Sequence, residues 1–220
     1  MVEISASILS VEKENSIKKF YELETGKIDY FHIDVMDGKF VPKNTTAQML
    51  EYAEYIKQIS NVPLDVHLMV EDVKTWVLAY SGFNPNIITF HYEALKTKEA
   101  VMDVIKFIKD NGAKVGISVK PGTPVEEIYE FLPYVHMVLV MTVEPGLGGQ
   151  GLIPETLDKV KTLKQYLTDN NLEIDIEVDG GIKVNNIKEA VEAGIDIAVV
   201  GTGLTASDNI AETVKQLKQQ

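Results

Sequence analysis

Eight short apolar segments recur along this chain, and the stretches between them carry apolar residues at helical spacing. Several of the segments are continuous apolar runs, which is typical of strands in a parallel sheet that helices cover. Residues 98–111, which lie between two of them, place Val101 and Val104 on one helical face. We place the strands at residues 2–9, 28–35, 63–69, 86–91, 113–119, 136–142, 173–179 and 197–201.

Strand and helix alternating eight times predict an α/β fold, a single (β/α)8 TIM barrel that spans residues 1–220. The chain is slightly shorter than the ~250 residues typical of this fold, so we expect few insertions. Gly112 follows a helical stretch as a C′ residue, and Asn185 and Ser207 are placed to cap later helices. An open, doubly wound sheet is the weaker alternative, because no obvious glycine loop follows the first strand.

The charge and composition argue against several classes of function. With 33 acidic against 21 basic residues the formal net charge is −12, which disfavours a surface for nucleic acid or for an anionic membrane. The chain has no cysteine, and therefore neither a disulfide framework nor a thiolate metal site. We find no signal peptide and no apolar run that approaches ~18 residues, so we expect a cytoplasmic enzyme.

Polar side chains stand at the predicted C-terminal ends of several strands, where barrels place their chemistry. His32 and Asp34 occupy alternate positions of one strand, so they point to the same side of it. His67 and Asp179 end two further strands. Two histidines and two carboxylates predict a four-ligand site for one divalent metal ion, open to zinc, iron, manganese or cobalt, of which zinc is our first choice.

The other two histidines are expected to be structural. His136 stands at the start of its strand, at the end of a barrel where residues usually serve stability. His91 stands at the other end, but the only carboxylate partner in view is Glu93. We therefore interpret His91 as a structural residue near the site.

Three glycine-rich turns follow strands on the same rim. Residues 144–151 match G-x-G-x-x-G, but a dinucleotide fingerprint belongs to a first βαβ unit, and this loop lies two-thirds of the way along the chain. We expect its backbone amides to approach the oxygens of a smaller ligand, before a helix opened by Pro154.

The chain has no arginine, so backbone N–H groups would have to hold a phosphate. The loops after the last two strands are the common place for a phosphate in such barrels. These two loops contain Gly180, Gly181, Gly201 and Thr202.

Met36, Met69 and Met141 fall at strand ends on this rim as well. They are either ordinary core residues or soft, apolar walls of a pocket, and the sequence favours neither interpretation. Ser7, near the end of the first strand, adds a hydroxyl group to the same rim.

Five motifs occur in one order along the chain: FHIDVMDGKFVP, DVHLMV, VLVMTVEPGLGGQG, IEVDGGI and VVGTGL. Together they closely resemble the ribulose-phosphate 3-epimerase family, and the resemblance runs from Ser5 to Gly203. It implies a TIM barrel that interconverts D-ribulose 5-phosphate and D-xylulose 5-phosphate in the pentose phosphate pathway. It also implies a ketose phosphate as the small-molecule partner, and a homo-oligomer.

Carried over motif by motif, the resemblance implies roles for single residues. His32, Asp34, His67 and Asp179 correspond to the metal ligands, with Asp34 as the catalytic base and Asp179 as the acid. The residues that match substrate contacts are Ser7, His67, Gly146, Gly148, Gly149, Gly180, Gly181, Gly201 and Thr202, and with the three rim methionines they form the substrate site that we expect.

The chain departs from the family pattern around the rim that meets the sugar. Lys43 and Lys120 stand where asparagine is commoner, Leu147 replaces a phenylalanine, and Thr202 replaces a serine. The same 3-epimerase chemistry on a hexulose 6-phosphate, such as D-allulose 6-phosphate, therefore stays open. A lyase or decarboxylase on a related barrel would need an Asp-x-Lys-x-x-Asp array, which the third strand lacks. A non-catalytic phosphosugar-binding barrel is the more remote alternative, since both carboxylates and both histidines are retained.

Overall fold

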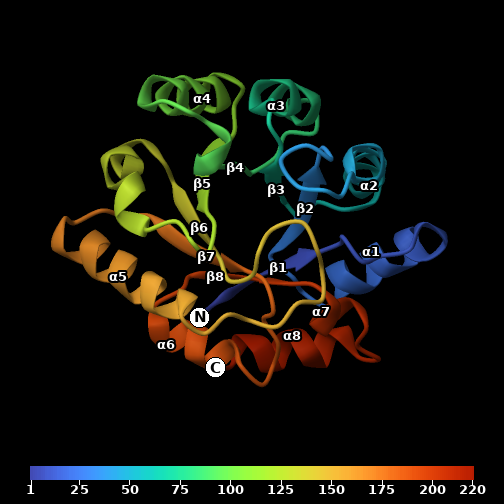
Figure 1. Cartoon of the computed structure of the whole chain (residues 1–220). Coiled ribbons are helices and arrows are strands. Elements are labelled where there is room, and N and C mark those ends of the chain that lie inside the picture. The colour runs from blue at the N-terminus through green and yellow to red at the C-terminus, as the bar shows by residue number, and fades with distance from the viewer.

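The computed structural model describes residues 1–220 and shows a closed barrel of parallel strands inside a ring of helices (Figure 1). Neighbouring strands follow the order of the sequence, and β8 pairs with β1 to close the ring. The strands are β1 (Glu3–Ser7), β2 (Tyr30–Met36), β3 (Leu64–Met69), β4 (Ile87–His91), β5 (Lys114–Val119), β6 (Met137–Met141), β7 (Asp175–Asp179) and β8 (Ile197–Val200).

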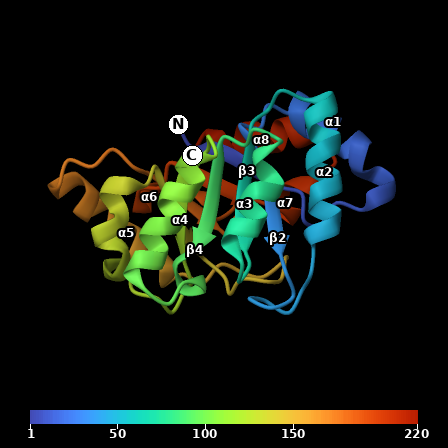
Figure 2. The ribbon, with the colours of Figure 1, turned by 90° about the horizontal axis from the view of Figure 1, so that it is seen from above.

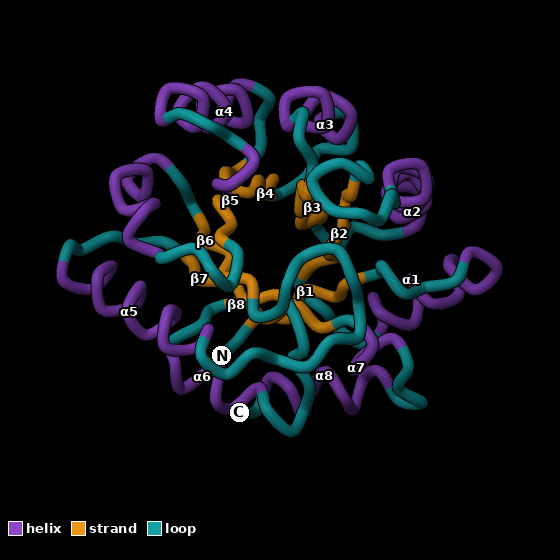
Figure 3. Tube along the Cα trace, viewed as in Figure 1, coloured by secondary structure: helices purple, strands orange, loops and turns teal.

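Helical segments connect the strands on the outside of the barrel (Figure 3). Between β5 and β6 the connection is a 3₁₀ segment instead of an α-helix, and it contains Pro133, which has no N–H to donate. None of the helices combines the length and the hydropathy that crossing a bilayer requires. The helices are η1 (Lys13–Asn15), α1 (Ser16–Thr25), α2 (Thr46–Ile59), α3 (Val73–Ser81), η2 (Tyr92–Ala94), α4 (Lys98–Asp110), η3 (Val125–Tyr134), α5 (Thr156–Asp169), α6 (Ile187–Ala193), α7 (Thr202–Thr205) and α8 (Ile210–Lys218).

Side chains along the strands alternate between two cores. Residues such as Ile33 and Val35 pack with the helices in a cluster of 56 buried hydrophobic residues. A separate cluster inside the barrel has six buried members, Leu139 and Met141 of β6 among them. Strands β2, β3 and β7 instead direct polar residues inwards, and these residues build the site described below.

All the strands run in one direction, so their C-terminal ends and the loops that follow gather at one end of the barrel (Figure 2). Both chain termini lie at the opposite end. The loop from β6 to α5 arches over the mouth of the barrel (Figure 1), where it brings Gly146 close to Val41 and Gly148 close to Leu9. The mouth is therefore covered on one side by a glycine-rich loop.

The barrel predicted from the sequence is confirmed, and each strand lies within two residues of its expected bounds. Gly112 follows Asn111, the C-cap of α4, and adopts a φ of +86°, as expected of a C′ residue. His136 directly precedes β6 at the N-terminal end of the barrel, where its Nδ1 accepts a hydrogen bond from Val115 N at 3.0 Å. The C′ position of Gly112 is predictable because it depends on one residue and its neighbours in the sequence.

Two predicted helix caps were wrong by one or two residues. The N-cap of α6 is Asn186 instead of Asn185. The N-cap of α8 is Asn209, whose Oδ1 accepts from Glu212 N, while Ser207 Oγ accepts from the N–H of Asn209 just before the helix. Adjacent capping residues compete at both places, so the sequence alone does not decide between them. Likewise α5 begins at Thr156, two residues after the expected Pro154.

Inside the barrel, Gly116 leaves room for the side chain of Thr89 on the neighbouring strand. A Cβ atom at position 116 would lie 2.9 Å from the Thr89 Cβ. We expect Gly116→Ala to lower the free energy of unfolding by about 1–3 kcal/mol, because the packed interior cannot take the extra methyl group. The measurement is urea denaturation followed by circular dichroism.

The matched control is Gly82→Ala at the end of α3. Gly82 has a φ of −63° and a Cβ there would meet no atom within 4 Å. We expect that variant to be unchanged or more stable by about 0.4–1 kcal/mol. Equal effects of the two substitutions would contradict the close packing inferred for Gly116.

Candidate active site

Four ionisable side chains meet inside the mouth of the barrel. His32 and Asp34 come from β2, His67 from β3 and Asp179 from β7, and one ligand atom of each lies within 4.8 Å of all the others. His32 Nε2 is 3.4 Å from Asp34 Oδ1, and His67 Nδ1 is 3.4 Å from Asp179 Oδ2. The closed barrel therefore brings these residues together, as the sequence predicted. Asp34 and His67, for example, occupy paired positions of β2 and β3.

The two imidazole nitrogens that face the carboxylates have no hydrogen-bond partner. They are His32 Nε2 and His67 Nδ1, and both rings are fully buried. A buried polar atom without a partner is costly, so such atoms need a ligand or a proton. Two imidazole nitrogens and two carboxylate oxygens pointing at one position form a donor set that suits a divalent transition metal.

Charge in this cluster is balanced between the imidazoles and the carboxylates. Burial alone would raise the pKa of Asp34, but His32 and His67 outweigh it and hold the pKa well below its usual range. Burial opposes charge on His32 as well, yet Asp65 and Asp34 raise its pKa well above the ordinary value. Burial also opposes charge on His67, but Asp179 and Asp34 outweigh it and raise the pKa of this ring. Asp34 is therefore a carboxylate at neutral pH.

A second buried cluster lies one layer deeper and was not identified from the sequence. Asp65 on β3 and Glu177 on β7 lie with His32 in a group whose ligand atoms are within 4.8 Å of one another. His32 Nδ1 donates to Asp65 Oδ2 at 2.5 Å, which leaves no room for a cation between these atoms. Ser5 Oγ donates to the same oxygen at 2.7 Å. This cluster orients His32 instead of forming a second metal site.

Glu177 is fully buried and neither of its carboxyl oxygens has a hydrogen-bond partner. Burial and the charge of Asp65 raise the pKa of Glu177 well above its usual range, which favours its protonated form. The signal for this layer was present in the sequence. Asp65 and Glu177 each stand two residues before a predicted site residue, at the alternate positions that face the same side of a strand.

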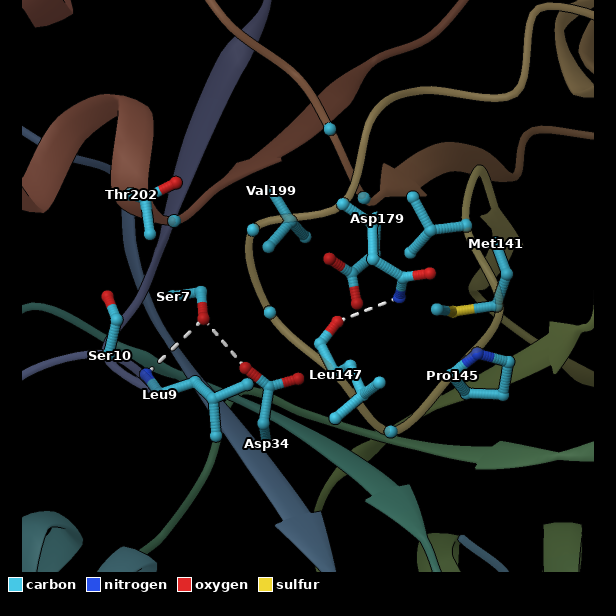
Figure 4. Close-up of a pocket in the computed structure, with 18 of the residues that line it drawn as sticks. Ser7, Leu9, Ser10, Asp34, Met141, Pro145, Leu147, Asp179, Val199 and Thr202 are labelled. Atoms are coloured by element: carbon cyan, nitrogen blue, oxygen red, sulfur yellow. Dashed lines mark hydrogen bonds between the residues drawn. The ribbon is translucent and has the colours of Figure 1, made fainter. Parts of the chain in front are cut away.

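A cleft opens above the four ionisable residues (Figure 4). Ser7 lies at its floor, where Oγ donates to Asp34 Oδ2 at 2.7 Å and accepts from Leu9 N at 3.4 Å. The cleft is lined by most of the residues expected at a substrate site, namely Ser7, Asp34, Met36, Met69, Met141, Gly146, Gly148, Gly149, Asp179, Gly180, Gly181, Gly201 and Thr202.

His32 and His67 do not line the cleft, because both rings are fully buried beneath it. Lys183 is the one lysine of the lining and was not singled out from the sequence. Among the four departures from the family pattern, Leu147 and Thr202 line the cleft, whereas Lys43 and Lys120 do not. Leu147 is 68% exposed at the rim.

The glycine turn after β7 is tightly packed against the loop that covers the mouth. Gly181 has a φ of +72°, and a Cβ there would lie 2.7 Å from Leu152 Cα. Gly180 has a φ of +124° and packs on Val143 in the same way. Only glycine fits this turn without moving the covering loop.

The comparison with protein-family models agrees with this geometry. A model described as "Ribulose-phosphate 3 epimerase family" matches residues 3–205. The chain belongs to the ribulose-phosphate 3-epimerase family. The resemblance found in the motifs is thereby confirmed.

Curated ribulose-phosphate 3-epimerases are similar to the chain over most of its length. The protein from Mycobacterium bovis is 41% identical, with 87% of this chain and 82% of that protein covered. The one from Methanocaldococcus jannaschii is 37% identical, with 100% and 91% covered. The one from Escherichia coli K12 is 34% identical, with 99% and 95% covered.

Solved structures of other enzymes share the barrel with this epimerase-family chain. KGPDC from Streptococcus mutans superposes with a TM-score of 0.74 at 12% identity, over 100% of this chain and 96% of that one. A 3-hexulose-6-phosphate synthase gives a TM-score of 0.72 at 14% identity, over 99% of each chain. At these identities the likeness establishes the fold.

The packing of Gly181 gives a prediction that separates backbone strain from steric contact. Gly149 has a similar φ of +77°, but a Cβ there would meet no atom within 4 Å. We expect Gly149→Ala to cost about 1 kcal/mol and Gly181→Ala about 2 kcal/mol or more, because only the second substitution also collides with backbone. Urea denaturation of both variants gives the difference, and equal losses would contradict it.

Proposed function

We propose that this chain, as one catalytic domain over residues 1–220, interconverts D-ribulose 5-phosphate and D-xylulose 5-phosphate. The observation that carries the proposal is the pair of carboxylates, Asp34 and Asp179, at the floor of the cleft. Membership of the ribulose-phosphate 3-epimerase family supports the same reaction. A homo-oligomeric state and a cytoplasmic location stay predictions from the sequence.

Epimerisation at C3 needs two proton transfers on opposite faces of the carbon atom. One group removes a proton, and a second group delivers one from the other side. In the closed barrel β8 and β1 separate β7 from β2, so Asp179 and Asp34 approach the cleft from different strands across its mouth. Asp34 is the base and Asp179 the acid for one epimer, and the roles exchange in the reverse direction.

The residues around Asp34 keep it ionised and fix its position. Its pKa lies below the usual range because of His32 and His67, so it is ionised before substrate binds. The Ser7 hydroxyl holds Oδ2 in place through the 2.7 Å hydrogen bond. As Asp34 takes the C3 proton, Ser7 can turn to a substrate oxygen, since a hydroxyl both donates and accepts.

A divalent metal fits the four convergent ligand atoms, two of which are otherwise buried without a partner. His32 Nε2, His67 Nδ1, Asp34 and Asp179 would hold it. Zinc is the first choice for this set, with iron, manganese and cobalt as alternatives. When bound, the ion acts as a Lewis acid that polarises the C2 carbonyl and favours the enediolate.

The far end of the cleft suits the phosphate of the substrate. The turns after β7 and β8 place Gly181, Gly201 and Thr202 in its lining. Backbone N–H groups there are the expected phosphate donors, since the chain has no arginine. Met36, Met69 and Met141 supply apolar walls on the side of the sugar, so the cleft separates an anionic end from a reacting end.

Substitution of either carboxylate tests the mechanism. We expect Asp34→Asn and Asp179→Asn each to lower kcat by ~10²–10⁴-fold, since an amide cannot accept or deliver the C3 proton. The assay follows conversion of D-ribulose 5-phosphate in deuterated water by proton NMR, with the metal content of each variant measured. Asp103→Asn, an exposed carboxylate that pairs with Lys74, is the control and keeps wild-type turnover.

The two variants should also differ in isotope exchange. Each retains the carboxylate that faces one side of C3, so each exchanges the C3 hydrogen of a different epimer. Unchanged turnover in Asp34→Asn would contradict the mechanism. Turnover of D-allulose 6-phosphate but not of D-ribulose 5-phosphate by the metal-loaded wild type would show that the substrate is a hexulose phosphate.

Metal binding should depend on pH in a fixed direction. Because the neighbouring carboxylates raise the pKa values of His32 and His67 against the effect of burial, protons compete with a cation for both rings. We therefore expect affinity for zinc or cobalt to weaken as pH falls from about 8 to about 6, with protons released on binding. Chelator competition and calorimetry in two buffers measure this, and removal of the metal should abolish turnover.

A further inference from the structure

His91, interpreted from the sequence as structural, makes a direct contact with a proposed metal ligand. It ends β4, and its fully buried ring packs on the ring of His67 with a centroid distance of 5.0 Å. Its Nε2 lies 2.9 Å from His67 Nε2. One of these two nitrogens must carry a hydrogen and the other must accept it.

Glu93 occupies the other side of the His91 ring. Its Oε2 lies 3.2 Å from His91 Nδ1. Its Oε1 accepts from Lys120 N at 2.7 Å and from Thr123 Oγ1 at 2.5 Å. The loop after β5 therefore fixes the carboxylate of Glu93 through Oε1, with its other oxygen turned to His91.

The contacts allow two arrangements of the ring hydrogens. In the first, His91 Nδ1–H donates to Glu93, His91 Nε2 accepts from His67 Nε2–H, and the lone pair of His67 is on Nδ1. In the second, His91 Nε2–H donates to His67, so a neutral His67 carries its hydrogen on Nδ1 and cannot bind a cation with that atom. The second arrangement also sets the lone pair of His91 Nδ1 against a carboxylate oxygen, which is repulsive.

We propose that Glu93 and His91 are positioning residues that select the tautomer of His67 and so direct its Nδ1 to the divalent metal. This inference rests on the proposed function only for the presence of the metal. The two histidine ligands are then supported differently. A carboxylate, Asp65, contacts His32 directly, whereas a neutral ring separates Glu93 from His67. His32 is accordingly the more strongly polarised ligand of the two.

The sharpest test is Glu93→Gln. The two donors of the β5 loop keep an oxygen at the Oε1 position, so the amide NH₂ of the new side chain must face His91. That amide favours the second arrangement of hydrogens, and we expect affinity for zinc to fall by ~10–100-fold. Chelator competition measures the affinity, and Glu130→Gln, which removes an exposed carboxylate paired with Lys98, is the control.

Nitrogen-15 NMR of the histidine rings gives a readout that a purely structural role would not change. In the zinc-loaded wild type we expect hydrogen on His67 Nε2 and on His91 Nδ1. Hydrogen on His91 Nε2 in that protein would overturn the proposal. So would a Glu93→Gln variant with wild-type affinity and an unchanged ring pattern.

A second variant separates the tautomer from the packing of the loop. Thr123→Val removes one donor to Glu93 but keeps its charge and its contact with His91. We expect wild-type zinc affinity in this variant, and an equal loss in both variants would show that only the loop matters. These measurements need no sugar phosphate, so absence of epimerase turnover would overturn the proposed reaction and leave the tautomer result standing.

Discussion

The close approach of two carboxylates and two imidazoles inside the barrel mouth is the interaction around which the structure is arranged. Unbalanced charge there would be costly, so each group has to be neutralised by another. Asp34 meets His32, His67 and the Ser7 hydroxyl, and the pKa shifts of the cluster follow from these contacts. The deeper residues then serve to hold the imidazoles in fixed orientations.

The barrel interior is divided into a polar side and an apolar side. Strands β1, β2, β3 and β7 direct serines, histidines and acids inwards, whereas β6 and β8 contribute Met137, Leu139 and Ile197 to an apolar cluster. Gly116 on β5 makes room for Thr89, so the side chains that fill the barrel also differ in size. This division leaves the reacting end of the cleft beside soft, apolar walls and concentrates the charged groups at its floor.

Sequence patterns predicted the strands and the four convergent residues. Side chains at alternate positions of a strand point to the same face, and in a closed parallel barrel these faces all point inwards, so the residues meet. Asp65 and Glu177 follow the same alternation but lie inside β3 and β7, away from the strand ends where a barrel places its chemistry. The contact between His91 and His67 could not be predicted, since it depends on side-chain rotamers across two strands whose register pairs His67 with Thr89. The N-cap residue was predicted wrongly where two capping residues stand close together.

Closure of the barrel joins parts of the chain that are made at different times. Ser5 on β1 pairs with Val199 on β8, so the ring cannot close until the eighth strand has left the ribosome. Until then β1 and β7 expose unpaired edges, which invite association with other chains. The loop that must close is nearly as long as the polypeptide, which makes this step slow on entropic grounds. Both edges therefore stay open to pairing with other chains until β8 is available.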